Sequence, residues 1–205
     1  MMLETLKSRK TSDTVFLIGG GNSLNTLLPD PSVLDGKDII SINTAYRLFP
    51  KSILFFADQK WFHIHKENLK NTFKGTIVTA SQKDRRFYVD NGLLFIFMRG
   101  PDNGISEVED KLSGSNSGQM AINLAVLMGY KKIVLLGFDM DSRTHKVHWH
   151  DGHGVGTNVS RYDTVFIPGM KSIVPFQEKL DFKVYNINRQ SVLKYFEFAD
   201  LEQFL

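Results

Sequence analysis

Short apolar runs separated by amphipathic stretches repeat along most of the chain. Each run has four to six residues and is rich in Val, Ile, Leu or Phe. Runs of this kind are typical of strands buried on both faces of a sheet, as in parallel sheets covered by helices. Seven runs carry the pattern: Thr14–Ile18, Asp38–Ile42, Ile53–Ala57, Thr76–Thr79, Leu93–Met98, Ile133–Leu136 and Phe182–Tyr185.

The stretches between these runs predict helices. The clearest is Gly118–Gly129, whose apolar residues recur at intervals of three and four and form one stripe. Helices are also expected at Gln59–Asn71 and at Gly169–Leu180, the latter with Pro168 at its start. Alternating strands and helices predict an α/β fold, with a doubly wound and mostly parallel sheet in a single domain.

Composition narrows the class of protein. The 205 residues are 42% hydrophobic and 23% charged, which fits one globular domain over residues 14–205. The polar residues 1–13 are expected to form a frayed lead-in. The net charge of +3 is too small and too dispersed to indicate nucleic-acid binding.

Absent sequence features exclude further classes. No apolar run approaches the roughly 20 residues that a membrane span needs, and no signal-peptide core precedes Thr14, so we expect a cytoplasmic protein without a membrane span. The chain has no cysteine. Disulfides, thiolate zinc sites and cysteine nucleophiles are therefore excluded.

Candidate ligand-binding residues follow the predicted strands. In open α/β sheets, ligands bind beyond the carboxyl ends of the strands, where the strand order reverses. Asn43 follows the second predicted strand, Asp58 the third, and Gly137 the strand at Ile133–Leu136. Loops are polar in general, so it is the set of such residues that favours a site at this edge.

The first predicted strand is followed by a turn of small residues: Gly19, Gly20, Gly21, Asn22 and Ser23. Glycines let the backbone approach a ligand closely and present N–H groups to an anion. Leu24 occupies the position of the third glycine in the dinucleotide fingerprint, and no stretch matches the P-loop pattern. The turn therefore predicts phosphate binding of another kind than in NAD enzymes or P-loop proteins.

A second group of small residues begins the clearest helix: Ser115, Asn116, Ser117 and Gly118. Ser and Asn are preferred helix caps, so simple capping is one interpretation. The other is a phosphate or ribose site, because a helix start offers free N–H groups, hydroxyls and a favourable dipole.

Histidines gather in one short segment. Four of the six histidines are His145, His148, His150 and His153. Histidine is the usual general base near neutral pH and a common metal ligand, and an extended segment would put His148 and His150 on one face as a metal pair. A solvated polar loop is the alternative, and we favour a catalytic or substrate-binding loop.

Asp139 and Asp141 have the D-x-D spacing with which many glycosyltransferases hold a divalent cation against a nucleotide diphosphate. Two carboxylates at this spacing can bind one Mg²⁺ or Mn²⁺ ion. Because the spacing is short and common, we favour no metal cofactor, and Mg²⁺ or Mn²⁺ remains the alternative.

Together these motifs resemble those of the family 42 glycosyltransferases, the bacterial CMP-sialic-acid-dependent sialyltransferases, and their phage and prophage relatives. The first turn of that family reads G-N-G-P-S-L, where this chain has GGGNSL, and an Asn follows the second strand in both. A Ser-Gly helix start, Gly-Tyr-Lys, Gly-x-Asp and a late Asn/Ser turn are also similar. The corresponding residues here are Ser117-Gly118, Gly129-Tyr130-Lys131, Gly137-Phe138-Asp139 and Asn188, Ser191 and Leu193.

The resemblance implies a modified Rossmann-like fold and a nucleotide site built from the first turn, Asn43 and the Ser117-Gly118 helix start. It also implies inverting, metal-free transfer from a nucleotide-sugar donor, with a CMP-sugar favoured, to a hydroxyl acceptor. His150 would deprotonate the acceptor, with His153 as its substitute, and Asp139 would orient the base or the ribose. A homo-oligomer remains open.

Three departures separate the chain from the family pattern. Gly20 replaces the Asn of the first turn, and Asp58 stands where an Asn is expected after the third strand. The stretch expected to hold the catalytic histidine contains Tyr162 and Asp163 instead.

Two alternatives to glycosyl transfer follow from the same residues. A more distant similarity to archaeal-type pterin pyrophosphokinases predicts magnesium-dependent pyrophosphoryl transfer through Asp139 and Asp141. The other alternative is a non-catalytic phage or prophage binding protein that retains the fold, since fold does not determine function.

Overall fold

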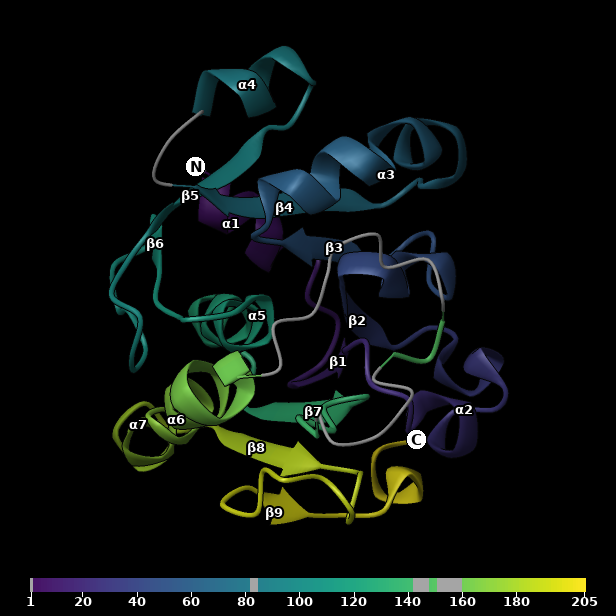
Figure 1. Cartoon of the computed structure of the whole chain (residues 1–205), viewed down its shortest axis with the longest axis vertical. Coiled ribbons are helices and arrows are strands. Elements are labelled where there is room, and N and C mark those ends of the chain that lie inside the picture. The colour runs from purple at the N-terminus through teal and green to yellow at the C-terminus, as the bar shows by residue number, and fades with distance from the viewer. Residues whose placement is uncertain (1, 82–84, 142–147, 151–159) are drawn as a thin grey trace.

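One parallel sheet runs through the molecule, with the strand order β6-β5-β4-β3-β2-β1-β7-β8-β9 (Figure 1). The computed structural model describes residues 2–81, 85–141, 148–150 and 160–205. Every strand pairing within these residues is parallel. The strands are β1 (Thr14–Ile18), β2 (Asp38–Ile42), β3 (Ile53–Phe56), β4 (Thr76–Ser81), β5 (Phe95–Arg99), β6 (Lys111–Leu112), β7 (Lys132–Leu136), β8 (Lys183–Asn186) and β9 (Glu197–Phe198).

Helices connect most of the strands. The α-helices are α1 (Met2–Lys7), α2 (Leu24–Leu27), α3 (Gln59–Thr72), α4 (Arg85–Asp90), α5 (Ser117–Leu127), α6 (Ile167–Lys171) and α7 (Val174–Lys179). A π-helical turn, Tyr162–Phe166, leads into α6, and 3₁₀ turns lie at Pro31–Leu34, Asn43–Arg47 and Leu201–Phe204. None of the described helices has the length and apolar character of a membrane span.

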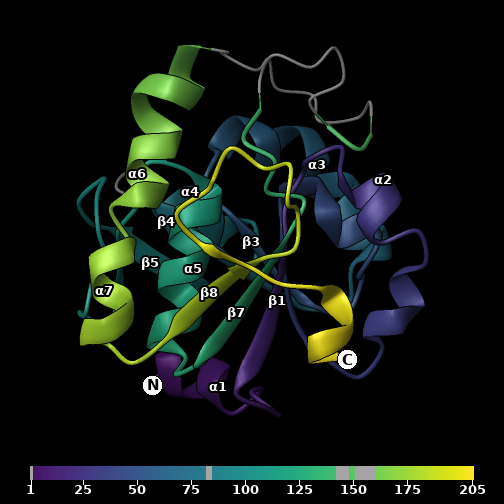
Figure 2. The ribbon, with the colours of Figure 1, turned by 90° about the horizontal axis from the view of Figure 1, so that it is seen from below.

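Helices cover both faces of the sheet (Figure 2). Alternate residues of β1 belong to different core clusters, with Val15 and Leu17 on one face and Phe16 and Ile18 on the other. Residues of α1, α5, α6 and α7 pack on the first face, and residues of α2, α3 and α4 pack on the second. The predicted single-domain, doubly wound α/β fold is confirmed.

The N-terminal segment is not a frayed lead-in, and that prediction was wrong. Residues 2–7 form α1, and its Leu3 and Leu6 are buried in the core on the face of the sheet that α5 covers. Thr11 and Ser12 continue the connection, because their backbone N–H groups donate to the Asp38 carboxylate at 2.8 and 3.1 Å. Leu3 and Leu6, with Met2 beside them, make one small apolar face on a six-residue helix, a weak signal in a segment of this length.

Differences between predicted and observed elements have local causes. The expected helix Gly169–Leu180 is divided into α6 and α7, since Pro175 in the first turn of α7 cannot donate a backbone hydrogen bond to the preceding turn. The two-residue strands β6 and β9 and the short helix α4 were not predicted. They are too short to show a hydrophobic period.

The topology places a ligand-binding edge beside β1. The strands β1 to β6 follow one another to one side of β1, and the chain then returns through α5 so that β7 pairs with β1 on the other side. Ile18 lies opposite Leu136, so the turns that follow β1 and β7 leave the sheet side by side. This is the switch point at which doubly wound proteins bind ligands.

Candidate functional site

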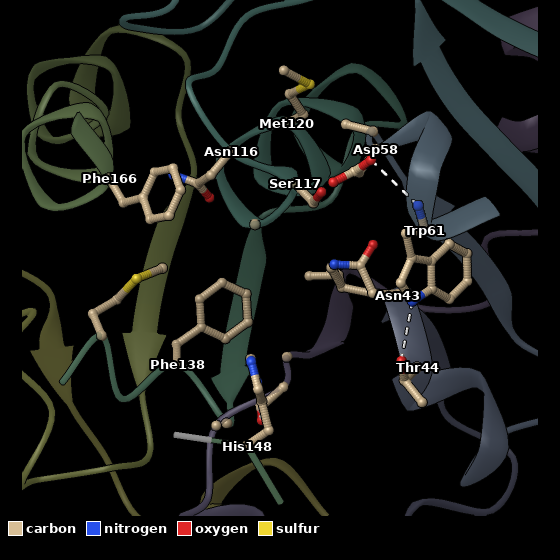
Figure 3. A pocket seen from close by; sticks show the side chains of 18 of the residues that line it. Asn43, Thr44, Asp58, Trp61, Asn116, Ser117, Met120, Phe138, His148 and Phe166 are labelled. Atoms are coloured by element: carbon tan, nitrogen blue, oxygen red, sulfur yellow. Dashed lines mark hydrogen bonds between the residues drawn. The ribbon is translucent and has the colours of Figure 1, made fainter. Parts of the chain in front are cut away.

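A cavity of about 520 Å³ lies at the carboxyl ends of the central strands (Figure 3). Its walls come from the turns after β1, β2, β3 and β7, the start of α5, residues 148 and 150, and the π-helical turn before α6. Most of the residues that the sequence predicted for a site line it. They are Gly19, Gly20, Gly21, Asn43, Asp58, Ser115, Asn116, Ser117, Gly118, Gly137, Asp139, Asp141, His148 and His150.

The remaining predicted residues lie elsewhere. Asn22 and Ser23 do not line the cavity, although Ser23 bonds to Asp139 below the glycine turn. His145 and His153 lie outside the described residues. The structure adds cavity residues that the sequence analysis did not select: Trp61, Arg99, Phe138, Arg161, Tyr162 and Phe166. Arg99 is the last residue of β5 and was detectable by its position at a strand end, whereas Trp61 and Phe166 come from helical segments.

Asp139 joins the turn after β1 to the turn after β7. Its carboxylate accepts the backbone N–H of Ser23 at 2.9 Å, the Ser23 hydroxyl, and the side-chain amide of Asn188 at 2.9 Å. Both oxygens are therefore engaged with donors of the protein itself. The carboxylate positions the glycine turn, and its predicted role in orienting a base or ribose remains a prediction.

The turn after β8 is also hydrogen-bonded to the segment that follows β7. The Ser191 hydroxyl donates to the backbone oxygen of Phe138 at 2.7 Å, and the N–H of Val192 donates to that of Asp139 at 3.0 Å. Together with Asn188, these residues explain why a late Asn/Ser turn accompanies the Gly-Phe-Asp segment in the sequence. The turns after β1, β7 and β8 form one hydrogen-bonded unit beneath the cavity.

Gly21 and Gly118 lie so close to side chains after β7 that a Cβ atom would not fit at either position. A Cβ atom on Gly21 would lie 2.6 Å from Cγ of Asp139, and one on Gly118 would lie 2.7 Å from Cε1 of Phe138. Both distances are below any normal carbon–carbon contact. The absence of side chains at these positions lets the turn after β1 and the start of α5 pack against the residues that follow β7.

The start of α5 is capped from within the chain. The Asn116 side chain accepts the N–H of Gln119 at 3.0 Å, and the buried Gln119 side chain accepts the N–H of Ser115 at 2.9 Å. The capping interpretation of this segment is thus correct for Asn116. Ser117 lies one residue further on and faces the cavity (Figure 3).

Asn43 brings a polar side chain to the cavity wall. Its backbone has φ = 51°, a left-handed conformation that Asn tolerates better than most residues. Its side-chain Oδ1 is buried and has no hydrogen-bond partner among the described residues. A buried acceptor left unpaired costs about 1–3 kcal/mol, so this atom is suited to a donor supplied by a ligand.

The neighbouring wall is rigid. Asp58 caps α3 by accepting the N–H groups of Lys60 and Trp61 at 2.8 and 3.3 Å. The fully buried Trp61 donates its indole N–H to the Thr44 hydroxyl at 3.1 Å. Figure 3 shows Asn43 and Asp58 on this wall, across the cavity from Phe138 and Phe166.

His148 is held against the glycine turn. Its Nδ1 lies 3.3 Å from the backbone oxygen of Gly20, and the N–H of the next residue, Trp149, donates to the same oxygen at 3.1 Å. A backbone oxygen can only accept, so Nδ1 carries the proton, and Nε2 of the neutral ring carries a lone pair. Burial lowers the pKa of His148, and the bond to Gly20 opposes part of this shift.

A pH dependence follows from His148. Its folded-state pKa lies below the unfolded value, so the unfolded chain binds more protons as the pH falls below about 6.5. The contribution of the neutral His148 ring to the free energy of unfolding is fully present above that pH. It is lost as the pH falls toward the folded-state pKa, and below that pKa no more is lost. We expect the melting temperature of the wild type to drop more between about pH 7.5 and about pH 5.5 than that of His148→Gln. An equal drop in both proteins would contradict this, and His63→Gln, which changes an exposed histidine, is the control.

Two arginines line the cavity, Arg99 and Arg161. The guanidinium of Arg161 lies over the ring of Phe166, 5.2 Å from its centroid. Arg99 reaches Asp102 at 3.4 Å at the end of β5. Tyr162 follows Arg161 in the chain and lines the cavity, and its pKa is raised, first by burial and then by the charge of Asp139. At neutral pH the phenol therefore keeps its proton and can donate a hydrogen bond.

The described residues give no cluster typical of a metal centre. Over residues 2–81, 85–141, 148–150 and 160–205, no three Asp, Glu or His side chains are grouped so that they could hold an ion. The rings of His148 and His150 stack at 6.0 Å between centroids. A cation bound by Asp139 and Asp141 would compete with the Ser23 and Asn188 donors for the oxygens of Asp139.

Comparison with known structures shows a shared fold. The α-2,3-sialyltransferase Cst-I of Campylobacter jejuni superposes with a TM-score of 0.60 at 16% sequence identity, over 94% of this chain and 82% of that one. The sialyltransferase CST-II, in complex with a trisaccharide acceptor and CMP, gives a TM-score of 0.56 at 16% identity, over 90% and 84% of the two chains. An apo α-2,3-sialyltransferase of C. jejuni gives 0.52 at 16% identity, over 92% and 80%. By sequence, no family model and no curated protein matches the chain significantly.

Proposed function

We propose that the protein is a glycosyltransferase that transfers a sugar from a nucleotide sugar to a hydroxyl group of an acceptor. One observation carries the proposal: the cavity at the β1/β7 switch point is lined by Asn43, whose buried Oδ1 has no partner among the described residues, together with the small residues expected to hold a nucleotide. The fold shared with sialyltransferases supports the same class of reaction.

The nucleotide would lie along the turn after β1 and the start of α5. Gly19 to Gly21 bring the backbone to the cavity surface, and Ser117 and Gly118 stand at the positive end of an eleven-residue helix. Phosphate oxygens are favoured at such a helix start. On this basis we favour a CMP-sugar as the donor, as the resemblance to family 42 implies.

The proposed transfer is a single displacement with inversion. The acceptor oxygen bonds to the anomeric carbon while the bond from that carbon to the phosphate oxygen breaks, and its electron pair remains on the phosphate. The acceptor proton moves to a histidine, which we assign to His150 with His153 as its substitute. Tyr162 and Arg161, on the cavity wall, would stabilise the charge on the departing phosphate.

His148 is a further candidate for the base. Its bond to Gly20 leaves Nε2 as the unprotonated nitrogen, and its lowered pKa keeps the ring neutral near pH 7. A neutral imidazole with a fixed tautomer can accept a proton from a hydroxyl group. Mutation of His148, His150 and His153 tests which of them is the general base. This test is separate from the test of the reaction class.

Thermal-shift measurements with CMP, CDP, UDP, GDP and ATP, each with EDTA, Mg²⁺ or Mn²⁺, test this function. At about 100 times its dissociation constant a ligand stabilises the fold by about 2.7 kcal/mol, or roughly 5–10 °C for a chain of this size. We expect CMP to raise the melting temperature equally with EDTA and with metal.

Two other outcomes would contradict the proposal. A response only to a di- or triphosphate with metal would favour pyrophosphoryl transfer through Asp139 and Asp141. No response to any nucleotide would favour a non-catalytic binding protein that retains the fold.

A further inference from the structure

Two walls of the cavity meet at a buried polar contact behind it. One wall is the start of α5, from which residues 115–118 line the cavity. The other is the turn before α6, which contributes Arg161, Tyr162 and Phe166. Helix α6 lies beside α5 in Figures 1 and 2, and the two helices come together at Gln119.

The side chain of Gln119 is fully buried and does not line the cavity. Its Oε1 accepts the backbone N–H of Ser115 at 2.9 Å and lies 3.1 Å from the Ser115 hydroxyl. Its Nε2 lies 3.4 Å from the backbone oxygen of Gly104 and 3.5 Å from the hydroxyl of Ser172. One amide therefore connects the entry to α5 with the loop after β5 and with the end of α6.

The turn before α6 is attached to the same pair of side chains. The Ser115 hydroxyl lies 3.2 Å from the backbone oxygen of Val165, inside the π-helical turn. In α6, a Cβ atom on Gly169 would lie 2.3 Å from the Ser115 hydroxyl oxygen and 2.5 Å from Gln119 Oε1. These distances leave no room for a side chain, so α6 packs directly onto Ser115 and Gln119. Both walls are thus fixed against one buried amide.

The bond to Ser115 differs from that of an ordinary capping box. Asn116 is the N-cap of α5 and Gln119 is the third helical residue, whose side chain in a capping box accepts the N–H of the N-cap residue itself. Here the side chain accepts the N–H of the preceding residue, Ser115. Within the described residues, the backbone N–H groups of Asn116, Ser117 and Gly118 form no hydrogen bond. Gln119 therefore fixes the entry to α5 without occupying these donors.

We propose that Gln119 is a positioning residue for nucleotide binding, whose side chain fixes the start of α5 and the turn before α6 relative to each other. The inference rests on the proposed function and names a residue outside the cavity on which the affinity depends. Without the amide, the Ser115 N–H loses its acceptor and the contact with α6 loses its polar partner, so both walls can shift. Binding groups must be held to within about 0.5 Å, so such shifts weaken binding.

The test is a calorimetric measurement of the dissociation constant of CMP, or of the nucleotide from the thermal-shift series that binds in its place, for wild type and Gln119→Met. Methionine has a similar length and volume but is only a weak acceptor, so this variant removes the hydrogen bonds without opening a large cavity. We expect the dissociation constant to rise at least about tenfold.

A second variant approaches the same contact from α6. Gly169→Ala crowds Ser115 and Gln119, and Gly169 does not line the cavity. We expect this variant to raise the dissociation constant at least about threefold, because α6 must move away from α5 to make room for the methyl group. Should Gln119→Met not fold, the result for Gly169→Ala decides.

Asn123→Leu is the matched control. Asn123 is a fully buried amide on the same helix, and its Oδ1 accepts the N–H groups of Ser106 and Ser113, both at 2.8 Å. None of these three residues lines the cavity. This variant should lose stability as Gln119→Met does, yet keep a dissociation constant within about threefold of wild type. Melting curves give the temperature at which all variants are folded and can be compared.

Two outcomes would overturn the inference. An unchanged dissociation constant in folded Gln119→Met would show that the amide does not position the nucleotide site. An equal loss of affinity in Asn123→Leu would attribute the effect to general loosening of the packing around α5. In both cases the wild type still binds a nucleotide, which distinguishes them from failure of the proposed function, where it binds none.

Discussion

Replacing Asp139 with alanine is expected to lower the free energy of unfolding by about 2–4 kcal/mol and to abolish nucleotide binding. The half-buried carboxylate accepts the N–H and hydroxyl of Ser23 and the amide of Asn188, and all three donors would lose their partner. The glycine turn after β1 would then lose its attachment to the turns after β7 and β8. Chemical denaturation measures the stability, and thermal shift with the best-binding nucleotide measures the ligand site.

Two further variants make the Asp139 result specific. Asp139→Asn keeps the shape of the side chain and one acceptor oxygen, so it should lose less stability than the alanine variant. Asp90→Ala, which removes an exposed carboxylate 3.8 Å from Arg86 on α4, should change stability by less than about 1 kcal/mol. If Asp139→Ala is as stable as Asp90→Ala, the carboxylate does not hold the three turns together.

Replacing His150 and His153 together with alanine is expected to slow sugar transfer by at least roughly 100-fold. A general base contributes about 10²–10⁴-fold to a rate, and neither histidine is expected to support the fold. The measurement is release of the nucleotide from the sugar donor in the presence of acceptor. The melting temperature and its shift with nucleotide should stay close to those of wild type, because the glycine turn after β1 is untouched.

His148→Ala and His63→Ala complete this experiment. His63 is exposed on α3 and does not line the cavity, so its variant should react at the wild-type rate. Normal transfer by the double variant, with loss of transfer in His148→Ala, would move the base to His148 and contradict the assignment to His150. Normal transfer by all of these variants would rule out a histidine base in this segment.

Much of the sheet and of the site edge could be predicted because both depend on local sequence. A strand buried on both faces must be apolar throughout, so runs such as Thr14–Ile18 and Ile133–Leu136 stand out without any knowledge of their partners. The residue after such a run must lie at the carboxyl edge, which is how Asn43 and Asp58 were found. Residues 2–7 were misassigned for the same reason, since three apolar residues within six positions are too few to show a helical period.

The sequence by itself therefore determined the α/β class, the central strands and the polar turns that end them, because hydrophobic periodicity and turn chemistry are properties of neighbouring residues. Only the tertiary structure decided which of these groups are already paired. Asp139 is bonded to Ser23 and Asn188, which are 116 and 49 residues away, whereas Asn43 Oδ1 is left without a partner in the described part of the chain. Pairings over such separations follow from strand order and register, which bring distant turns to one edge of the sheet and which no local pattern encodes.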